Sequence, residues 1–269
     1  MSESMWVHNK WVMWSVAALF FFAEYFARVD PSVLVPYLMK DFHVGALALG
    51  SLSVYFYYPY IIMQIPVGLL LDRYGPRRWL FFAALVSGLG SILFGMAPTL
   101  IVAKAGPFLI GLGASFAFVG ALKLATMWFK PRRLGLLAGL TQGAGMLGAA
   151  FGSGFFIILV STYGWRKAMG LVGLCLIFFA CLIFVFVRDK KTKEGRVVQN
   201  DKAKMGAVQA LLRVVRSRSS WMNALYAGLL YAPTAGLAEF WGVTFFHHLY
   251  GISAQTAGLL MGCVFVGWA

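Results

Sequence analysis

The sequence predicts an all-α, polytopic membrane protein. Hydrophobic residues make up 61% of the 269 residues and charged residues only 12%, against about 45–50% and about 25% in ordinary soluble domains. The mean hydropathy is +0.78, and uncharged stretches reach the roughly 20 residues that a helix needs to cross the hydrocarbon core of a bilayer. A water-soluble chain of this size cannot bury so much apolar surface, so a soluble enzyme is excluded.

The uncharged stretches define eight candidate spanning helices. The first, 11–38, is apolar but is interrupted by Glu24, Arg28 and Asp30. The stretch 79–103 breaks at Pro98, because proline cannot continue a helix, and this break separates the third span from the fourth. The other stretches are 45–71, 105–122, 134–165, 168–187, 219–238 and 249–269. No small-residue cleavage site follows the first apolar run, so this run is expected to remain as an uncleaved span.

Basic residues are concentrated in alternate loops. With the N-terminus placed inside, most of the 23 Lys and Arg side chains fall in cytoplasmic segments, whereas the outer loops carry Lys40, Arg166 and Lys167. This distribution follows the positive-inside rule. It predicts a multi-pass protein of the bacterial cytoplasmic (inner) membrane with a cytoplasmic N-terminus. The net charge of +14 is attributed to loops that face anionic lipid, and no nucleic-acid partner is expected.

The spans fall into three segments. Residues 1–187 form a predicted bundle of six helices, 188–220 a basic cytoplasmic linker, and 221–269 the first two helices of a second, incomplete bundle. Apolar residues recur at helical spacing in the second half of the linker, which predicts a short amphipathic helix on the membrane surface. They are Met205, Val208, Leu211, Leu212 and Val215. For the first half of the linker, a solvated chain is an equal alternative.

Glycine is concentrated in the fourth and fifth spans. Small residues spaced three or four apart let helix backbones approach closely in lipid. The glycines concerned are Gly111, Gly113, Gly120, Gly139, Gly143, Gly145, Gly148 and Gly152. We expect them to mark contacts between helices rather than a ligand site.

The turn after the second span carries the most specific motif. It reads Gly68-Leu-Leu-Leu-Asp72-Arg73-Tyr-Gly75-Pro-Arg77-Arg78. Its glycines permit close approach and unusual backbone angles, and Asp72 is one acid among three arginines. The motif resembles the loop signature of the major facilitator superfamily, Gly-x3-Asp-Arg-x-Gly-x-Arg-Arg, and matches it at every defining position. The turns at 128–133 and 163–166, and the plan of bundle, basic linker and second bundle, are similar to that family as well.

The resemblance implies twelve helices in two related halves, and a gating role for the loop 68–78, which packs against the second bundle in the family. The stretches 28–42 and 238–242 resemble bacterial members that take up organic anions and other metabolites. Pro107 stands where members often carry an arginine, so the proton-coupling role of that arginine is not carried over. Gly148 is followed by Ala149 instead of the proline of the antiporter signature. The chain stops inside the eighth expected helix, so we expect a fragment or a natural truncation.

Ionisable side chains within the spans are the main candidate site residues, because each costs about 2.5–3.5 kcal/mol at mid-bilayer. Glu24 and Arg28 are four residues apart on one helix face and can pair. Arg28 is expected to bind an anionic substrate group, and Glu24, Asp30 and Glu239 are expected to couple transport to protons. The alternatives are a structural ion pair near Arg28 and a structural hydrogen bond at Glu239.

Further polar side chains are candidates for the substrate cavity. Lys123, near the cytoplasmic end of the fourth span, either lines the cavity or extends to the interface. The second span offers the polar tips Tyr55, Tyr57, Tyr58, Tyr60 and Gln64. Of these, Tyr58 and Gln64 are taken with Lys123 as substrate-binding candidates, and aromatic packing is the alternative for the tyrosines.

The sequence therefore predicts a secondary active transporter that moves a small anionic metabolite together with protons by alternating access. The alternatives are a truncated, non-transporting membrane remnant or scaffold, and an efflux antiporter. No enzyme activity, cofactor or metal site is expected, because no nucleophile–base or metal-ligand spacing occurs in the spans and the three cysteines lie in apolar runs. The expected partners are the substrate, protons and the lipid bilayer, with a monomer if the chain is full-length.

Overall fold

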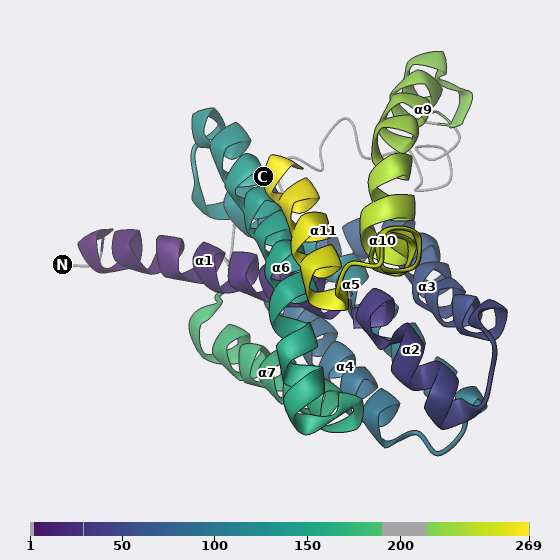
Figure 1. Ribbon diagram of the computed structural model, residues 1–269. Coiled ribbons are helices and arrows are strands. Elements are labelled where there is room, and N and C mark those ends of the chain that lie inside the picture. Colours follow the sequence, from purple (N-terminus) through teal and green to yellow (C-terminus); the bar gives the residue numbers. More distant parts are fainter. Residues whose placement is uncertain (1–2, 29, 190–212, 214, 269) are drawn as a thin grey trace.

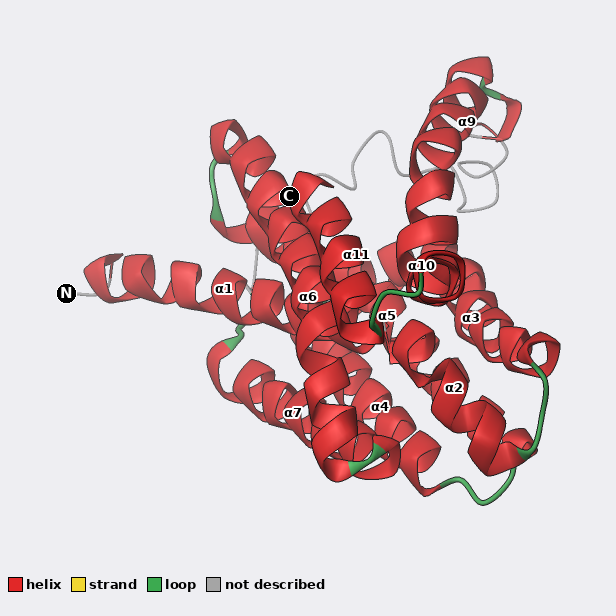
Figure 2. Ribbon diagram, viewed as in Figure 1, coloured by secondary structure: helices red, strands yellow, loops and turns green. Residues whose placement is uncertain are grey.

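The computed structural model describes residues 3–28, 30–189, 213 and 215–268. Within these residues every regular element is a helix, and no strand occurs (Figure 2). Five helices, α3 to α7, contain stretches long and apolar enough to cross a membrane. The predicted all-α membrane fold is confirmed.

The first span consists of two helices, α1 (Glu3–Arg28) and α2 (Asp30–Phe42). The next five are continuous: α3 (Ala46–Tyr74), α4 (Pro76–Met96), α5 (Leu100–Trp128), α6 (Leu134–Tyr163) and α7 (Trp165–Phe186). The predicted break at Pro98 is confirmed, because α4 ends at Met96 and Thr99 caps α5 by accepting a hydrogen bond from the Val102 backbone N–H. A short 3-10 turn, Pro131–Arg133, precedes α6.

The seventh span has an irregular middle. It runs through α9 (Arg218–Pro233), a π-helical segment η4 (Thr234–Trp241) and α10 (Gly242–Tyr250). The eighth span is α11 (Ala254–Trp268). The expected amphipathic helix of the linker falls mostly on residues 190–212 and 214, outside the described residues, so the division at 187 and 220 stays a prediction.

Contacts between specific pairs of helices form the bundle. α4 lies against α5 and α7, α3 against α5, and α1 against α6, α5 and α7. α11 packs along α6 (Figure 1). The long side chains buried between the helices include Phe20, Leu80, Leu124 and Phe156. This packing brings α1, α3 and α5 together, which positions the candidate site.

Several of the glycines lie where helix backbones come closest. A Cβ atom at Gly111 would overlap the carbonyl oxygen of Phe56 on α3, and one at Gly148 would overlap the carbonyl oxygen of Phe22 on α1. The expected role in helix contacts is confirmed at these positions. It is wrong for Gly139, where a Cβ would meet no atom of the described residues within 4 Å.

This difference predicts opposite outcomes for two identical substitutions. Gly111→Leu should lower the stability of the protein in detergent by about 1–3 kcal/mol or more, because α3 must move away from α5. Gly139→Leu should have little effect, since its side chain enters open space. Thermal unfolding of the two variants, followed by tryptophan fluorescence, compares them directly. Equal midpoints would contradict the packing.

Candidate functional site

Arg28 lies among aromatic rings at the end of α1. Its Nη2 donates a hydrogen bond to the hydroxyl of Tyr57 on α3, at 2.8 Å. Five ring centroids lie within 5.2–5.9 Å of its Cζ atom, a separation at which a cation is attracted to the face of a ring. The rings belong to Tyr25, Phe56, Tyr57, Tyr60 and Tyr231. We call these five residues the Arg28 cage.

Three elements build the cage. α1 places Tyr25 three residues before Arg28, and α3 contributes three of the rings at helical spacing. Tyr231 comes from α9, more than 200 residues further along the chain. The rings also support one another, since Phe56 and Tyr60 stack with centroids 5.9 Å apart and an interplanar angle of 17°. The guanidinium is thus held where the first and seventh spans meet.

A small apolar pocket adjoins the cage. Its polar lining residues are Arg28, Ser53 and Tyr57. The remaining walls come from α1, α2, α3, α4, α5 and α7, and include Leu38 and Ile110. Arg28 therefore presents a positive charge at the edge of an otherwise apolar space, where electrostatic interactions are stronger than in water.

Glu24 lies one helical turn before Arg28 and is only 3% exposed. Its carboxyl group has the Ser87 hydroxyl of α4 as a polar neighbour, and neither carboxyl oxygen forms a hydrogen bond or ion pair with Arg28. The expected pairing of Glu24 with Arg28 is therefore wrong. Although the two residues share a helix face, the long guanidinium side chain extends to Tyr57 instead.

The loop between α3 and α4 is attached to two other helices. Lys123 of α5 forms an ion pair with Asp72, at 2.5 Å. The backbone N–H of Arg77 donates to the carboxylate of Asp189, just after α7, at 3.0 Å. Gly75 has a φ of +83°, and a Cβ there would touch the same carboxylate. The loop therefore needs glycine at this position for both conformation and space.

Of the remaining residues of the motif, Arg77 also contacts α7 through its side chain, whereas the other two arginines lie on the surface. The Arg77 Nη2 donates to the carbonyl of Phe184 at 2.7 Å. Arg73 and Arg78 are exposed, and Gly68 has open space around its Cα. In the described residues, the loop thus contacts the ends of α5 and α7. Its expected gating role stays a prediction.

The other predicted site residues are distributed as follows. Lys123 lies thirteen residues along α5 from Ile110, or about 20 Å from the pocket beside Arg28, so it adjoins the loop. Tyr58 is 60% exposed, and Gln64 is exposed as well. The backbone of Glu239 lies in η4, but its side chain and that of Asp30 are outside the described part of the structure.

Three cage residues, Tyr25, Phe56 and Tyr231, were not predicted from the sequence. Tyr57 and Tyr60 were predicted only as members of a group of tyrosines in the second span. Helical spacing could have identified Tyr25, which precedes Arg28 by three residues. No local pattern identifies Tyr231, because its contact with Arg28 is long-range.

A bundle of helices, five of them long and apolar enough to cross a membrane, defines the class of polytopic membrane proteins. The family model of the Major Facilitator Superfamily matches residues 13–269. The chain belongs to this superfamily, as the loop motif predicted.

The curated relatives of this chain are transporters. It is 29% identical to the uncharacterized transporter YybO of Bacillus subtilis, over 94% of this chain and 60% of that protein. It is 28% identical to the probable sulfoacetate transporter SauU of Cupriavidus necator, over 74% of this chain and 46% of that protein. It is 25% identical to the probable L-galactonate transporter of Escherichia coli, over 96% of this chain and 59% of that protein. The chain thus spans about half to 60% of the length of these relatives.

Solved structures share the fold. A bacterial homolog of the human lysosomal transporter Spinster, in an inward-facing and unoccupied conformation, superposes with a TM-score of 0.76 at 15% identity, covering 96% of this chain and 60% of that chain. The fucose:proton symporter of E. coli superposes with a TM-score of 0.66 at 18% identity, covering 94% of this chain and 68% of that chain.

The cage predicts a contrast between neighbouring tyrosines. Tyr57→Phe removes the hydroxyl that accepts from Arg28 and should lower stability by about 1.5–3 kcal/mol, the usual cost of losing a hydrogen bond to a charged group. Tyr58→Phe removes an exposed hydroxyl and should change stability by less than about 0.5 kcal/mol. Unfolding midpoints of the purified variants measure both effects. A larger loss for Tyr58→Phe would show that the cage geometry is incorrect.

Proposed function

We propose that this chain provides the first bundle and part of the second bundle of a secondary active transporter for a small anionic metabolite. The observation that carries the proposal is the Arg28 cage. A guanidinium stays charged at any physiological pH and offers planar donors that match carboxylate and sulfonate groups. Its place between α3 and α9, beside an apolar pocket, suits an anion that enters between the two bundles.

The relatives support an anionic substrate. Two of them are named as probable transporters of sulfoacetate and L-galactonate, and both compounds are anions. The common element is an acid group on a small molecule, which is the chemistry that one arginine recognises. We therefore propose a small organic acid as the substrate class.

Glu24 supports coupling to protons. Intramembrane carboxyl groups mark proton pathways in transporters, and Glu24 is buried one turn from Arg28 without an ion pair to it. It is placed to respond when an anion binds to Arg28. We propose Glu24 as a proton-coupling residue, with Asp30 and Glu239 as further candidates, and symport as the direction of coupling.

The transport cycle is proposed to follow alternating access around this site. α2 contacts η4 and α10, so the first and seventh spans meet on one side of Arg28. The loop 68–78 lies at the opposite end of the bundle and is proposed to act as the inner gate. We propose that the N-terminus and this loop face the cytoplasm, in agreement with the basic residues they carry.

Substitution of Arg28 tests the substrate site. In proteoliposomes carrying the complete gene product, we expect Arg28→Ala to weaken counterflow exchange of the transported organic acid by at least about tenfold, since one charged hydrogen bond is lost. Arg132→Ala, a charge-matched control on the exposed turn before α6, should leave the exchange unchanged. Full affinity for every transported anion in Arg28→Ala would overturn the assignment.

Substitution of Glu24 tests coupling separately from binding. Glu24→Gln should abolish accumulation driven by a pH gradient but retain counterflow exchange, because exchange needs no net proton movement. Glu24→Asp, which keeps the carboxyl group, should retain part of the accumulation. Proton-driven accumulation at the wild-type level in Glu24→Gln would remove Glu24 from the coupling mechanism.

A further inference from the structure

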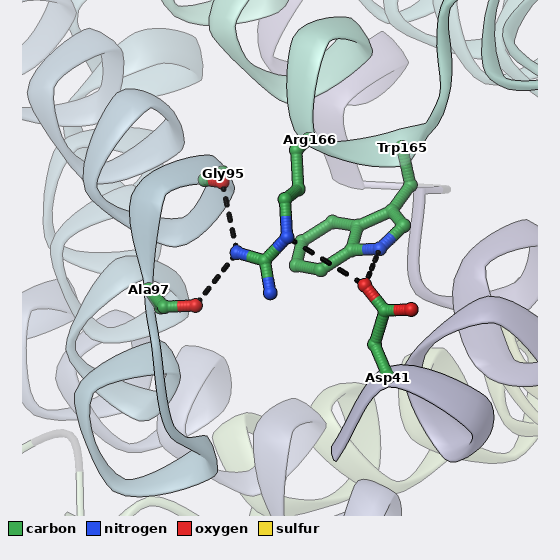
Figure 3. Close-up of polar contacts among 5 residues, drawn as sticks. All are labelled: Asp41, Gly95, Ala97, Trp165 and Arg166. Carbon is green, nitrogen blue, oxygen red and sulfur yellow. Dashed lines mark hydrogen bonds and ion pairs between the residues drawn. The ribbon is translucent and has the colours of Figure 1, made fainter.

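A second polar cluster lies at the opposite end of the bundle from the loop 68–78. Asp41, in the last turn of α2, accepts a hydrogen bond from the indole Nε1 of Trp165 at 2.7 Å (Figure 3). The same carboxylate oxygen lies 3.5 Å from Nε of Arg166. The Nη1 of Arg166 donates to the carbonyl oxygens of Ala97, at 2.7 Å, and Gly95, at 3.3 Å. The cluster therefore joins the ends of α2, α4 and α7.

These hydrogen bonds satisfy polar groups that have no partner within their own helices. Trp165 is only 5% exposed, and a buried indole N–H requires an acceptor. The carbonyls of Gly95 and Ala97 belong to the C-terminal end of α4, where they lack partners within the helix and where a cation is favoured. α4 and α7 touch closely there, because a Cβ at Gly95 would lie 2.6 Å from the carbonyl oxygen of Arg166.

Asp41 extends this rigid junction to α2. Leu38 of α2, Phe94 of α4 and Met169 of α7 line the pocket beside Arg28 and belong to one buried apolar cluster. The polar contacts of Asp41 add a direct attachment of the end of α2 to α7 at the edge of this cluster.

α2 contacts α3 and α6 of the first bundle, and also η4 and α10 of the seventh span. α2 begins two residues after Arg28, so any movement of α2 acts directly on the residue that we place in the substrate site. An opening at this end can occur on either side of α2. The contacts of Asp41 with Trp165 and Arg166 add to the packing of α2 on α3 and α6 and favour its attachment to the first bundle.

We propose that Asp41, Trp165 and Arg166 form an outer clamp that makes α2 move as one body with α4 and α7. The opening at this end then separates α2 from η4 and α10, while Arg28 keeps its position against α3. The clamp residues are positioning residues. The inference rests on the proposed alternating-access function for its role in transport, but the attachment of α2 can be measured without any substrate.

The attachment can be tested by cysteine labelling of the complete protein in detergent. Cys175, Cys181 and Cys263 are replaced by alanine, and Leu38→Cys is introduced as the reporter, since Leu38 is 1% exposed. N-ethylmaleimide should label it slowly. Asp41→Ala and Trp165→Phe should each raise the labelling rate by about tenfold or more, the factor expected when one hydrogen bond to a charged group no longer opposes opening.

Three controls make the result specific to the clamp. The double variant should label no faster than the faster single variant, because both changes break one contact. Asp41→Glu, which keeps the carboxylate, should restore slow labelling, and Lys40→Ala, on the neighbouring exposed residue, should have no effect. A second reporter, Leu124→Cys, is buried in α5 far from the clamp and should label at one rate in all variants.

Slow labelling of Leu38→Cys in both clamp variants would overturn the proposal, as would an equal increase at Leu124→Cys, which would indicate general destabilisation. These outcomes are independent of the transport assay. If labelling responds as expected but no organic acid exchanges, the proposed function fails and the clamp stands. If exchange occurs but labelling does not respond, the clamp fails and the proposed function stands.

Discussion

A permanently charged guanidinium inside a bundle of apolar helices is the constraint on which the rest of the structure depends. A charged side chain among apolar helices costs free energy unless it finds partners. The structure supplies aromatic faces and a tyrosine hydroxyl from α1, α3 and α9. These partners hold the charge in place, and they leave it at the edge of a pocket.

Close packing of the helices holds the rings around Arg28 in position. Gly111 lets α5 approach the backbone of α3 at Phe56, which is itself a cage residue. Gly148 brings α6 against α1 in the same way. Small residues at the crossings thus fix the helices that carry the rings, while the ends of the bundle are joined by polar contacts of Asp72 and Asp41.

The sequence predicted the class of fold and most helix boundaries, because long apolar stretches and a proline break such as Pro98 act locally. It also identified the family from one loop. It did not predict that Arg28 donates a hydrogen bond to Tyr57. A spacing of four residues correctly placed Glu24 on the same helix face as Arg28. The arginine side chain is long, however, and its guanidinium extends to Tyr57 on α3. The contribution of Tyr231 depends on a long-range contact that no local pattern records.

The most direct test of the central claim is a structure of the complete protein with its transported organic acid bound. We predict that the acid group lies within hydrogen-bond distance of the Arg28 guanidinium, between α3 and α9, with its organic part toward the apolar pocket. An acid group bound elsewhere, with Arg28 still enclosed by the same five rings, would contradict it.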